Sequence, residues 1–161
     1  MVKETTIKLQ HIRQIIEKVT DPEIPVLTIS DLGILRDVKF NNDEVEVIIT
    51  PTYTGCPAMD MIAMNIKLAL MSNGYSNIKI TSVLAPAWTT DWMSDEGKKK
   101  LKAYGIAPPY KKPEGTPETK ISCPQCNSEN TRLISEFGST ACKSLYQCMD
   151  CKEPFDYFKC H

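Results

Sequence analysis

Residues 123–151, CPQCNSENTRLISEFGSTACKSLYQCMDC, hold two C-x-x-C pairs separated by 21 residues, 127–147. In a zinc ribbon, each such pair forms a tight turn whose two thiolates converge on one ion, and the segment between the pairs brings the turns together. We therefore expect Cys123, Cys126, Cys148 and Cys151 to bind one metal ion, Zn²⁺ or iron, in a closed tetrahedral site. Ordinary buried thiols or a redox pair are disfavoured, because the segment is too small for a hydrophobic core of its own.

Three further candidate ligands lie in or after this segment. Cys142 sits between the two pairs, and Cys160 and His161 end the sequence. One of them could replace a ribbon ligand or form a second, partial site. The alternative is that Cys142 is a small buried side chain and that the last two residues form a loose tail.

Before the ribbon the composition changes sharply. Residues 108–119 (PPYKKPEGTPET) hold four prolines and almost no apolar side chain, which predicts a semi-rigid linker. We expect three parts: a first module over 1–107, the linker 108–119 and the four-cysteine ribbon over 120–161.

The first module shows alternating helix and strand periodicities. Apolar spacing predicts a helix over 5–19, strands over 34–40, 44–50 and 78–84, a helix over 56–73 and a short helix over 94–104. This order, helix–strand–strand–helix–strand, predicts an α+β fold: a small α/β sandwich with helices on one side of the sheet, followed by a zinc-ribbon-like β module.

A single cysteine precedes the predicted second helix. In TPTYTGCPAMD (50–60), Cys56 lies where unpaired N–H groups and the helix dipole favour negative charge. We therefore expect a lowered pKa and a thiol suited to reaction or to soft-metal capture, with Asp21 and Glu23 as acidic neighbours. Simple packing of Cys56 under the helix remains the alternative. The absence of a His-Asp or Lys constellation argues against a hydrolase.

Charge and hydropathy exclude several classes of partner. Nineteen basic and twenty acidic residues give a net charge of −1, which provides no field for nucleic acid or an anionic membrane. The amino terminus lacks the apolar stretch of a signal peptide, and no window approaches the ~20 apolar residues of a membrane span. We expect a cytoplasmic protein, and a homodimer is left open.

The motifs DPEIPVLTISDLGILRDV (21–38) and TPTYTGCP (50–57), with the tryptophan after the third strand, resemble the metal-sulfur cluster biosynthesis domain of SufT-like factors. With the terminal ribbon added, the chain resembles the PaaD (PaaJ) family of phenylacetate-degradation accessory proteins. The resemblance implies that Cys56 is the motif cysteine and that Asp21, Glu23 and Asp31 form the family's acidic loop. It also implies that Thr54-Gly55 is the threonine-glycine pair that precedes the motif cysteine.

The resemblance implies a non-catalytic assembly, targeting or maturation factor for the iron–sulfur clusters of the phenylacetyl-CoA epoxidase. In this hypothesis Cys56 binds iron or a cluster transiently. The protein clients would be oxygenase or reductase subunits, together with iron–sulfur assembly proteins. The alternative is a structural adaptor subunit of that complex with only a structural zinc. A thiol redox enzyme is disfavoured, because neither C-x-x-C pair begins a helix of thioredoxin type.

Overall fold

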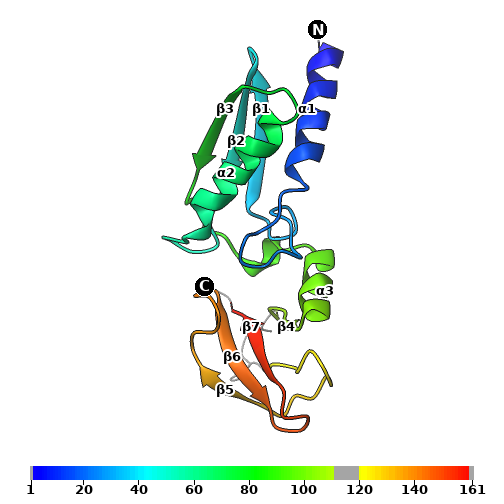
Figure 1. Ribbon diagram of the computed structural model, residues 1–161, viewed down its shortest axis with the longest axis vertical. Helices are drawn as coiled ribbons and strands as arrows, with labels where there is room; N and C mark the ends of the chain where they lie inside the picture. The colour runs from blue at the N-terminus through cyan, green and yellow to red at the C-terminus, as the bar shows by residue number, and fades with distance from the viewer. Residues whose placement is uncertain (1, 111–119, 160–161) are drawn as a thin grey trace. The chain divides into compact units, whose positions relative to one another are not determined.

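The computed structural model describes residues 2–110 and 120–159, which fall into two compact units, Met1–Trp88 and Thr89–His161 (Figure 1). The first unit contains α1 (Val2–Ile16), β1 (Leu35–Asn41), β2 (Glu44–Ile49), α2 (Ala58–Met71) and β3 (Asn77–Ser82). The predicted order of elements in an α+β fold is therefore confirmed. No described helix is long and apolar enough to cross a membrane.

The sheet of the first unit has the order β1-β2-β3. β1 and β2 form an antiparallel hairpin whose turn residues Asn42 and Asp43 have φ angles of 49° and 62°. Asparagine and aspartate tolerate this left-handed backbone, which two-residue hairpin turns require. β3 pairs with β2 in parallel, and α2 makes the crossover between them. The central strand β2 is thus paired on both sides.

Helix α2 supplies much of the core because its buried residues recur every four positions. Ala58, Ile62, Ile66 and Leu70 are buried. On the opposite face, Met61, Met64, Leu68 and Met71 are more than half exposed. Helices α1 and α2 contact each other and pack on the sheet. The helical period thus assigns one face of α2 to the core.

The segment between α1 and β1 is an ordered part of the core. Its apolar residues Ile24, Leu27, Ile29, Leu32 and Ile34 are all buried. The indole Nε1–H of Trp88 donates a 2.8 Å hydrogen bond to the carbonyl of Leu32. The last residue of the first unit is thereby attached to the loop between α1 and β1, which also contains Asp21 and Glu23.

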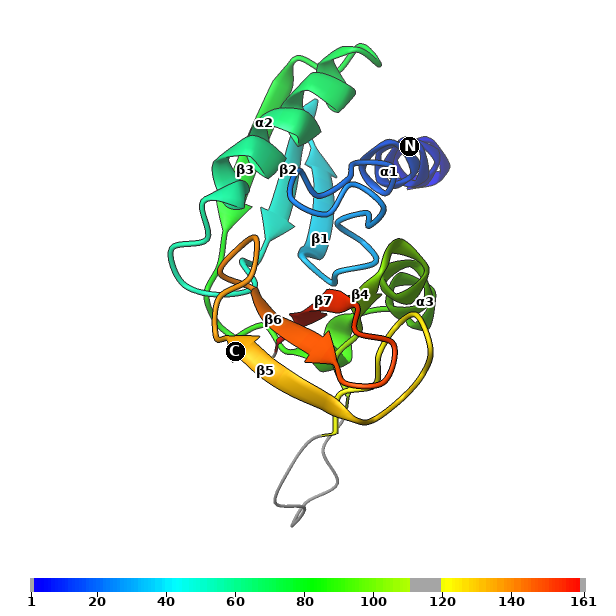
Figure 2. The ribbon, with the colours of Figure 1, turned by 60° about the horizontal axis from the view of Figure 1, so that its bottom comes forward.

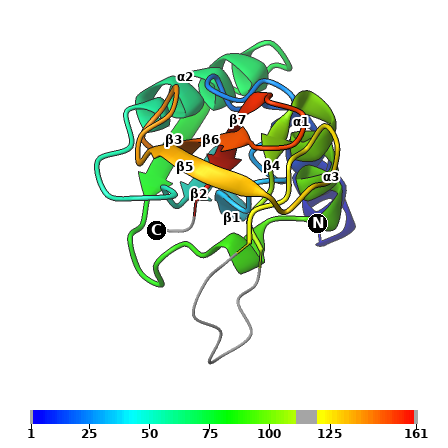
Figure 3. The same ribbon diagram turned by 90° about the horizontal axis from the view of Figure 1, so that it is seen from below.

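The second unit contains η1 (Thr90–Trp92), α3 (Asp95–Tyr104), β4 (Ile106–Ala107), β5 (Thr131–Ser135), β6 (Lys143–Cys148) and β7 (Pro154–Phe158). Its four strands lie in the order β4-β7-β6-β5, as Figure 2 shows. β5, β6 and β7 form an antiparallel meander with β5 at the edge (Figure 3). The predicted zinc-ribbon-like β module is therefore present.

The structure groups residues 89–107 with the ribbon, whereas the sequence placed them in the first module. The reason is that Ile106 and Ala107 of β4 pair in parallel with Asp156 and Tyr157 of β7. A pairing between two strands so far apart in the chain cannot be predicted from the local periodicity of the sequence. Residues 111–119 of the predicted linker lie outside the described residues, so the linker and the three-part division stay predictions.

Two leucines of α2 provide a matched test of this packing. Leu70 is fully buried and Leu68 is 53% exposed. We expect Leu70→Ala to lower the free energy of unfolding by about 2–5 kcal/mol, because it leaves a cavity, and Leu68→Ala to change it by less than about 0.5 kcal/mol. Urea unfolding of the full chain, followed by far-ultraviolet circular dichroism, measures both. Equal effects would contradict the assigned helix faces.

Candidate metal centre and thiol site

The four cysteines of the two C-x-x-C pairs lie together in the second unit. Their Sγ atoms all lie within 4.8 Å of one another. The Sγ atoms of Cys123 and Cys151 are 3.7 Å apart, and those of Cys126 and Cys148 are 3.6 Å apart. Tetrahedral zinc with Zn–S bonds of about 2.3 Å separates neighbouring sulfurs by about 3.8 Å. The four thiols therefore fit a zinc-ribbon metal site.

Two equivalent turns, the first knuckle (123–128) and the second knuckle (148–153), place these sulfurs. In each, the N–H of the first cysteine donates to the carbonyl five residues later, from Cys123 to Ser128 and from Cys148 to Glu153, both at 2.9 Å. The residue after the second cysteine has a left-handed backbone, with φ of 61° at Asn127 and 69° at Lys152. The two turns thus share one backbone pattern, and together they bring the four sulfurs within 4.8 Å of one another.

Backbone donors favour the thiolate form within the second knuckle. The N–H of Cys151 donates to the sulfur of Cys148 and lowers the pKa of that thiol from 9.0 to about 7. The thiolate is the form that ligates a metal ion. Burial and the neighbouring sulfurs raise the pKa of Cys151 to about 12, so Cys148 is the thiol of this knuckle that ionises first.

The hydrophobic core around the knuckles is small, and two of its members are themselves ligands. It consists of Ala107, Ile121, Cys123, Cys148, Phe155 and Tyr157, with Tyr146 packed against it. A ribbon whose knuckles surround so small a cluster gains much of its stability from a bound metal ion. The metal site and the fold of the ribbon depend on each other.

Cys142 lies away from the four-sulfur cluster. It precedes β6, whereas Cys148 ends β6, so about 3.3 Å per residue separates them by roughly 20 Å. The Cys142 thiol is buried and lies 3.0 Å from the Thr140 hydroxyl. Cys142 therefore does not share an ion with Cys148. Cys160 and His161 lie outside the described residues, and a second site that includes them stays a prediction.

Cys56 lies in the loop before α2 in the first unit and is half-buried. Gly55, with φ of 80°, turns the chain into this position, and Pro57 is the N-cap of α2. The N–H of Ala58 and the side chain of Tyr53 hydrogen-bond to the Cys56 sulfur. The expected placement at the beginning of the helix is therefore observed.

The expected lowering of the Cys56 pKa is wrong. Burial raises the pKa of this thiol above 9.0, and the carboxylates of Glu23 and Asp21 raise it further. The Ala58 N–H opposes this change but does not overcome it. Cys56 is thus a protonated thiol near two acids, because burial and like charge outweigh the helix terminus.

The acidic residues near Cys56 also shape their own loop. The Asp21 carboxylate accepts 2.8 Å hydrogen bonds from the N–H groups of Glu23 and Ile24. Asp31 accepts from the N–H of Thr28, while the Thr28 hydroxyl accepts from the N–H of Asp31. Asp21 is buried and Glu23 is half-buried. The structure thus brings Asp21, Glu23 and Cys56 into electrostatic contact.

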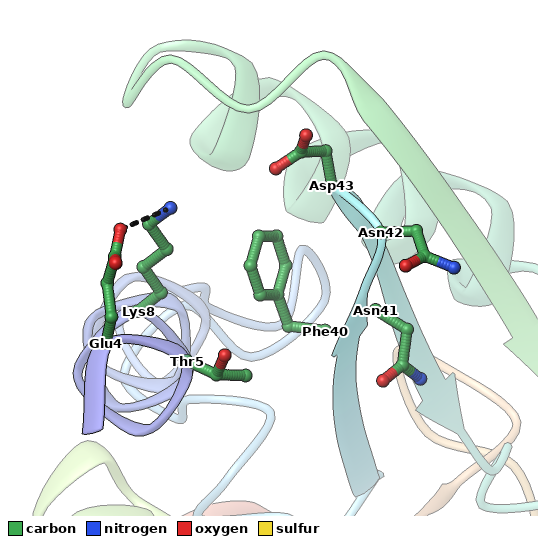
Figure 4. A pocket seen from close by; sticks show the side chains of 7 residues that line it. All are labelled: Glu4, Thr5, Lys8, Phe40, Asn41, Asn42 and Asp43. Carbon is green, nitrogen blue, oxygen red and sulfur yellow. Dashed lines mark ion pairs between the residues drawn. The ribbon is translucent and has the colours of Figure 1, made fainter. Parts of the chain in front are cut away.

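A surface hollow of about 510 Å³ lies at the other end of β2, between α1 and the hairpin turn (Figure 4). It is lined by Glu4, Thr5, Lys8, Phe40, Asn41, Asn42 and Asp43. The Lys8 ammonium pairs with Glu4 at 3.3 Å and lies 5.8 Å from the centre of the Phe40 ring. The Lys8 ammonium is thus already paired with a carboxylate. None of the lining residues belongs to the Cys56 loop.

Ser128 and Asp150 are not among the residues expected from the sequence, yet their side chains are hydrogen-bonded to each other between the knuckles. Each lies two positions after a ligand cysteine, Cys126 or Cys148. This equal spacing from a ligand cysteine is the feature of the sequence that could have pointed to Ser128 and Asp150.

Comparison with known families assigns a class to each half of the chain. Residues 9–75 match the model of an iron–sulfur cluster assembly protein, and residues 107–159 match the PaaD zinc beta ribbon domain. A protein of Escherichia coli (strain K12), named as one subunit of a "Putative 1,2-phenylacetyl-CoA epoxidase", is 45% identical over 95% of this chain and 93% of its own length. The chain belongs to the PaaD family.

Two further similarities concern the first unit. The "Fe-S protein maturation auxiliary factor" of Porphyromonas gingivalis is 35% identical over 57% of this chain and 89% of its own. The crystal structure of a domain of unknown function, DUF59, from Bacillus anthracis superposes with a TM-score of 0.58 at 27% identity. That match covers 63% of this chain and 97% of the other.

The raised pKa of Cys56 predicts slow alkylation. We expect iodoacetamide to modify Cys56 with a pH midpoint higher than that of an unperturbed cysteine, because burial and two carboxylates raise the pKa of this thiol. Glu23→Gln should move the midpoint to lower pH by removing one negative charge. Mass spectrometry of the Cys56 peptide measures the rates, with Asp60→Asn as an exposed control. A midpoint lower than that of an unperturbed cysteine in a short peptide would contradict the assignment.

Metal removal should affect the two units differently. We expect a chelator to expose 120–159 to limited proteolysis while the first unit stays resistant, because only the ribbon relies on metal ligation. Mass spectrometry of the fragments locates the cuts, and added Zn²⁺ should restore protection. Equal resistance with and without chelator would show that the ribbon holds its fold without an ion.

Proposed function

We propose that this protein is a non-catalytic maturation factor that handles iron or iron–sulfur clusters for a 1,2-phenylacetyl-CoA epoxidase in the cytoplasm. One observation carries the proposal: the Cys56 thiol lies beside Asp21 and Glu23, in the unit that matches iron–sulfur cluster assembly proteins. Sulfur and carboxylate groups together are suited to iron as a cargo.

The charges around Cys56 favour a thiolate that has bound a cation over a bare thiolate. Glu23 and Asp21 disfavour a bare thiolate at Cys56, yet the same carboxylates attract a cation. When iron binds, the Cys56 thiol releases its proton to water and its sulfur replaces one existing iron ligand. Delivery is the reverse exchange, in which a client cysteine takes the iron and Cys56 recovers a proton. No electron is transferred in either direction.

The ribbon has a different role in this proposal. Its four cysteines hold one structural ion, and we assign Zn²⁺ because four thiolates at tetrahedral spacing leave no open position for chemistry. The ribbon then docks the client, an oxygenase or reductase component of the epoxidase, while the first unit presents Cys56.

A second candidate function is an adaptor within the epoxidase. It is favoured by the name of the Escherichia coli relative, which describes that protein as a subunit. In this case zinc in the ribbon is the sole metal, and Cys56 packs without binding iron.

The two functions differ in what a Cys56 variant does. We expect Cys56→Ser to fold normally but to lower the cluster content of the reductase co-expressed with it, because the sulfur that carries the iron is absent. Iron and sulfide analysis of the purified reductase measures this. Asp43→Asn, at the opposite end of β2, is the control. Unchanged cluster content in the Cys56→Ser strain would remove the delivery mechanism.

The metal content of the protein itself separates the candidates independently. Purified without oxygen after incubation with ferrous iron and sulfide, the factor should show visible absorption that Cys56→Ser loses, while zinc stays at one ion per chain. A colourless protein with zinc alone would favour the adaptor.

A further inference from the structure

Three residues outside the ligand set, Ser128, Asn130 and Asp150, connect the knuckles of the ribbon. The Ser128 hydroxyl donates to one carboxylate oxygen of Asp150, and the Asn130 side-chain amide donates to the other at 2.8 Å. The Ser128 hydroxyl also accepts a 3.0 Å hydrogen bond from the backbone N–H of Asn130. The backbone carbonyl of Asn130 accepts a 2.7 Å hydrogen bond from the N–H of Met149. We call the side chains of Ser128, Asn130 and Asp150 the brace.

The brace is attached directly to two metal ligands. The backbone N–H of Ser128 donates to the sulfur of Cys126, and the backbone N–H of Asp150 donates to the sulfur of Cys148. These two sulfurs are 3.6 Å apart and belong to different knuckles. Thus the residue that supports a ligand in one knuckle is hydrogen-bonded to the residue that supports a ligand in the other.

This arrangement restrains the distance between the knuckles. Within a knuckle, two cysteines are held together by a short stretch of chain, but the two C-x-x-C pairs are 21 residues apart in sequence. Without a metal ion, four thiols offer little mutual attraction, so other contacts keep the pairs facing each other. One of them is the pairing of β5 with β6, which places Thr131 opposite Cys148. The brace is a contact of this kind, with a charged acceptor that strengthens both of its hydrogen bonds.

We propose that Ser128, Asn130 and Asp150 preorganise the four-sulfur site and thereby set its metal affinity and its rate of metal loss. They act as positioning residues, since none of them contributes a sulfur to the cluster. Hydrogen-bonded residues behind metal ligands typically change metal affinity about 10- to 100-fold when they are removed. The same range is expected for the brace.

Glu153 provides a matched control within the same unit. It lies two positions after Cys151, as Asp150 lies two positions after Cys148, and its backbone N–H donates to the Cys151 sulfur. Within residues 2–110 and 120–159, its carboxylate makes no hydrogen bond or ion pair that would tie it to the other knuckle. Glu153→Ala therefore tests the loss of one acidic charge near the metal site while the brace stays intact.

The experiment measures Zn²⁺ affinity of the full chain by competition with a chromogenic chelator, and the geometry of bound Co²⁺ by its visible absorption. We expect Asp150→Ala and Ser128→Ala each to weaken Zn²⁺ binding at least about 10-fold, and the double variant to be little worse than either single one. Glu153→Ala should weaken it less than about threefold.

A conservative variant separates hydrogen bonding from charge. Asp150→Asn keeps an acceptor for Ser128 but removes the negative charge, so its affinity should lie nearer to the unmodified chain than that of Asp150→Ala. The proposal is overturned if Asp150→Ala and Glu153→Ala weaken binding equally, or if the two single variants combine additively. Tetrahedral Co²⁺ absorption in each variant verifies that the four ligands still assemble.

Discussion

The convergence of four cysteine sulfurs within 4.8 Å is the constraint on which the second unit depends. Two of these cysteines, Cys123 and Cys148, also belong to its small hydrophobic core. The ligands therefore connect the knuckles to the strands, and β7 and β4 are added to that framework. Metal ligation and packing are here one cooperative event, as is common in small metal-binding domains.

The first unit is built on a different principle. Its core consists of aliphatic side chains from both helices, the sheet and the loop before β1, and it needs no cross-link. The Trp88 indole is hydrogen-bonded to the Leu32 carbonyl within that core. The position of Cys56 therefore depends on apolar packing, in contrast to the ligand cysteines of the second unit.

Much of this arrangement followed from sequence patterns, and the differences have identifiable causes. The helices and strands of the first unit and the four-sulfur cluster follow from periodicity and spacing, which are local signals. Residues 89–107 were assigned to the first module, whereas they group with the ribbon because β4 pairs with β7, about 50 residues later in the chain. The pKa of Cys56 was misjudged because burial and the approach of Glu23 are properties of the folded loop. The side-chain pairing of Ser128 with Asp150 likewise exists only once the knuckles meet.

The raised pKa of Cys56 has a consequence for its chemical lifetime. Peroxides and other electrophilic oxidants attack the thiolate and not the thiol, so a cysteine kept protonated by burial is oxidised slowly. The same surroundings that disfavour a bare thiolate at Cys56 thus slow the irreversible oxidation of its sulfur.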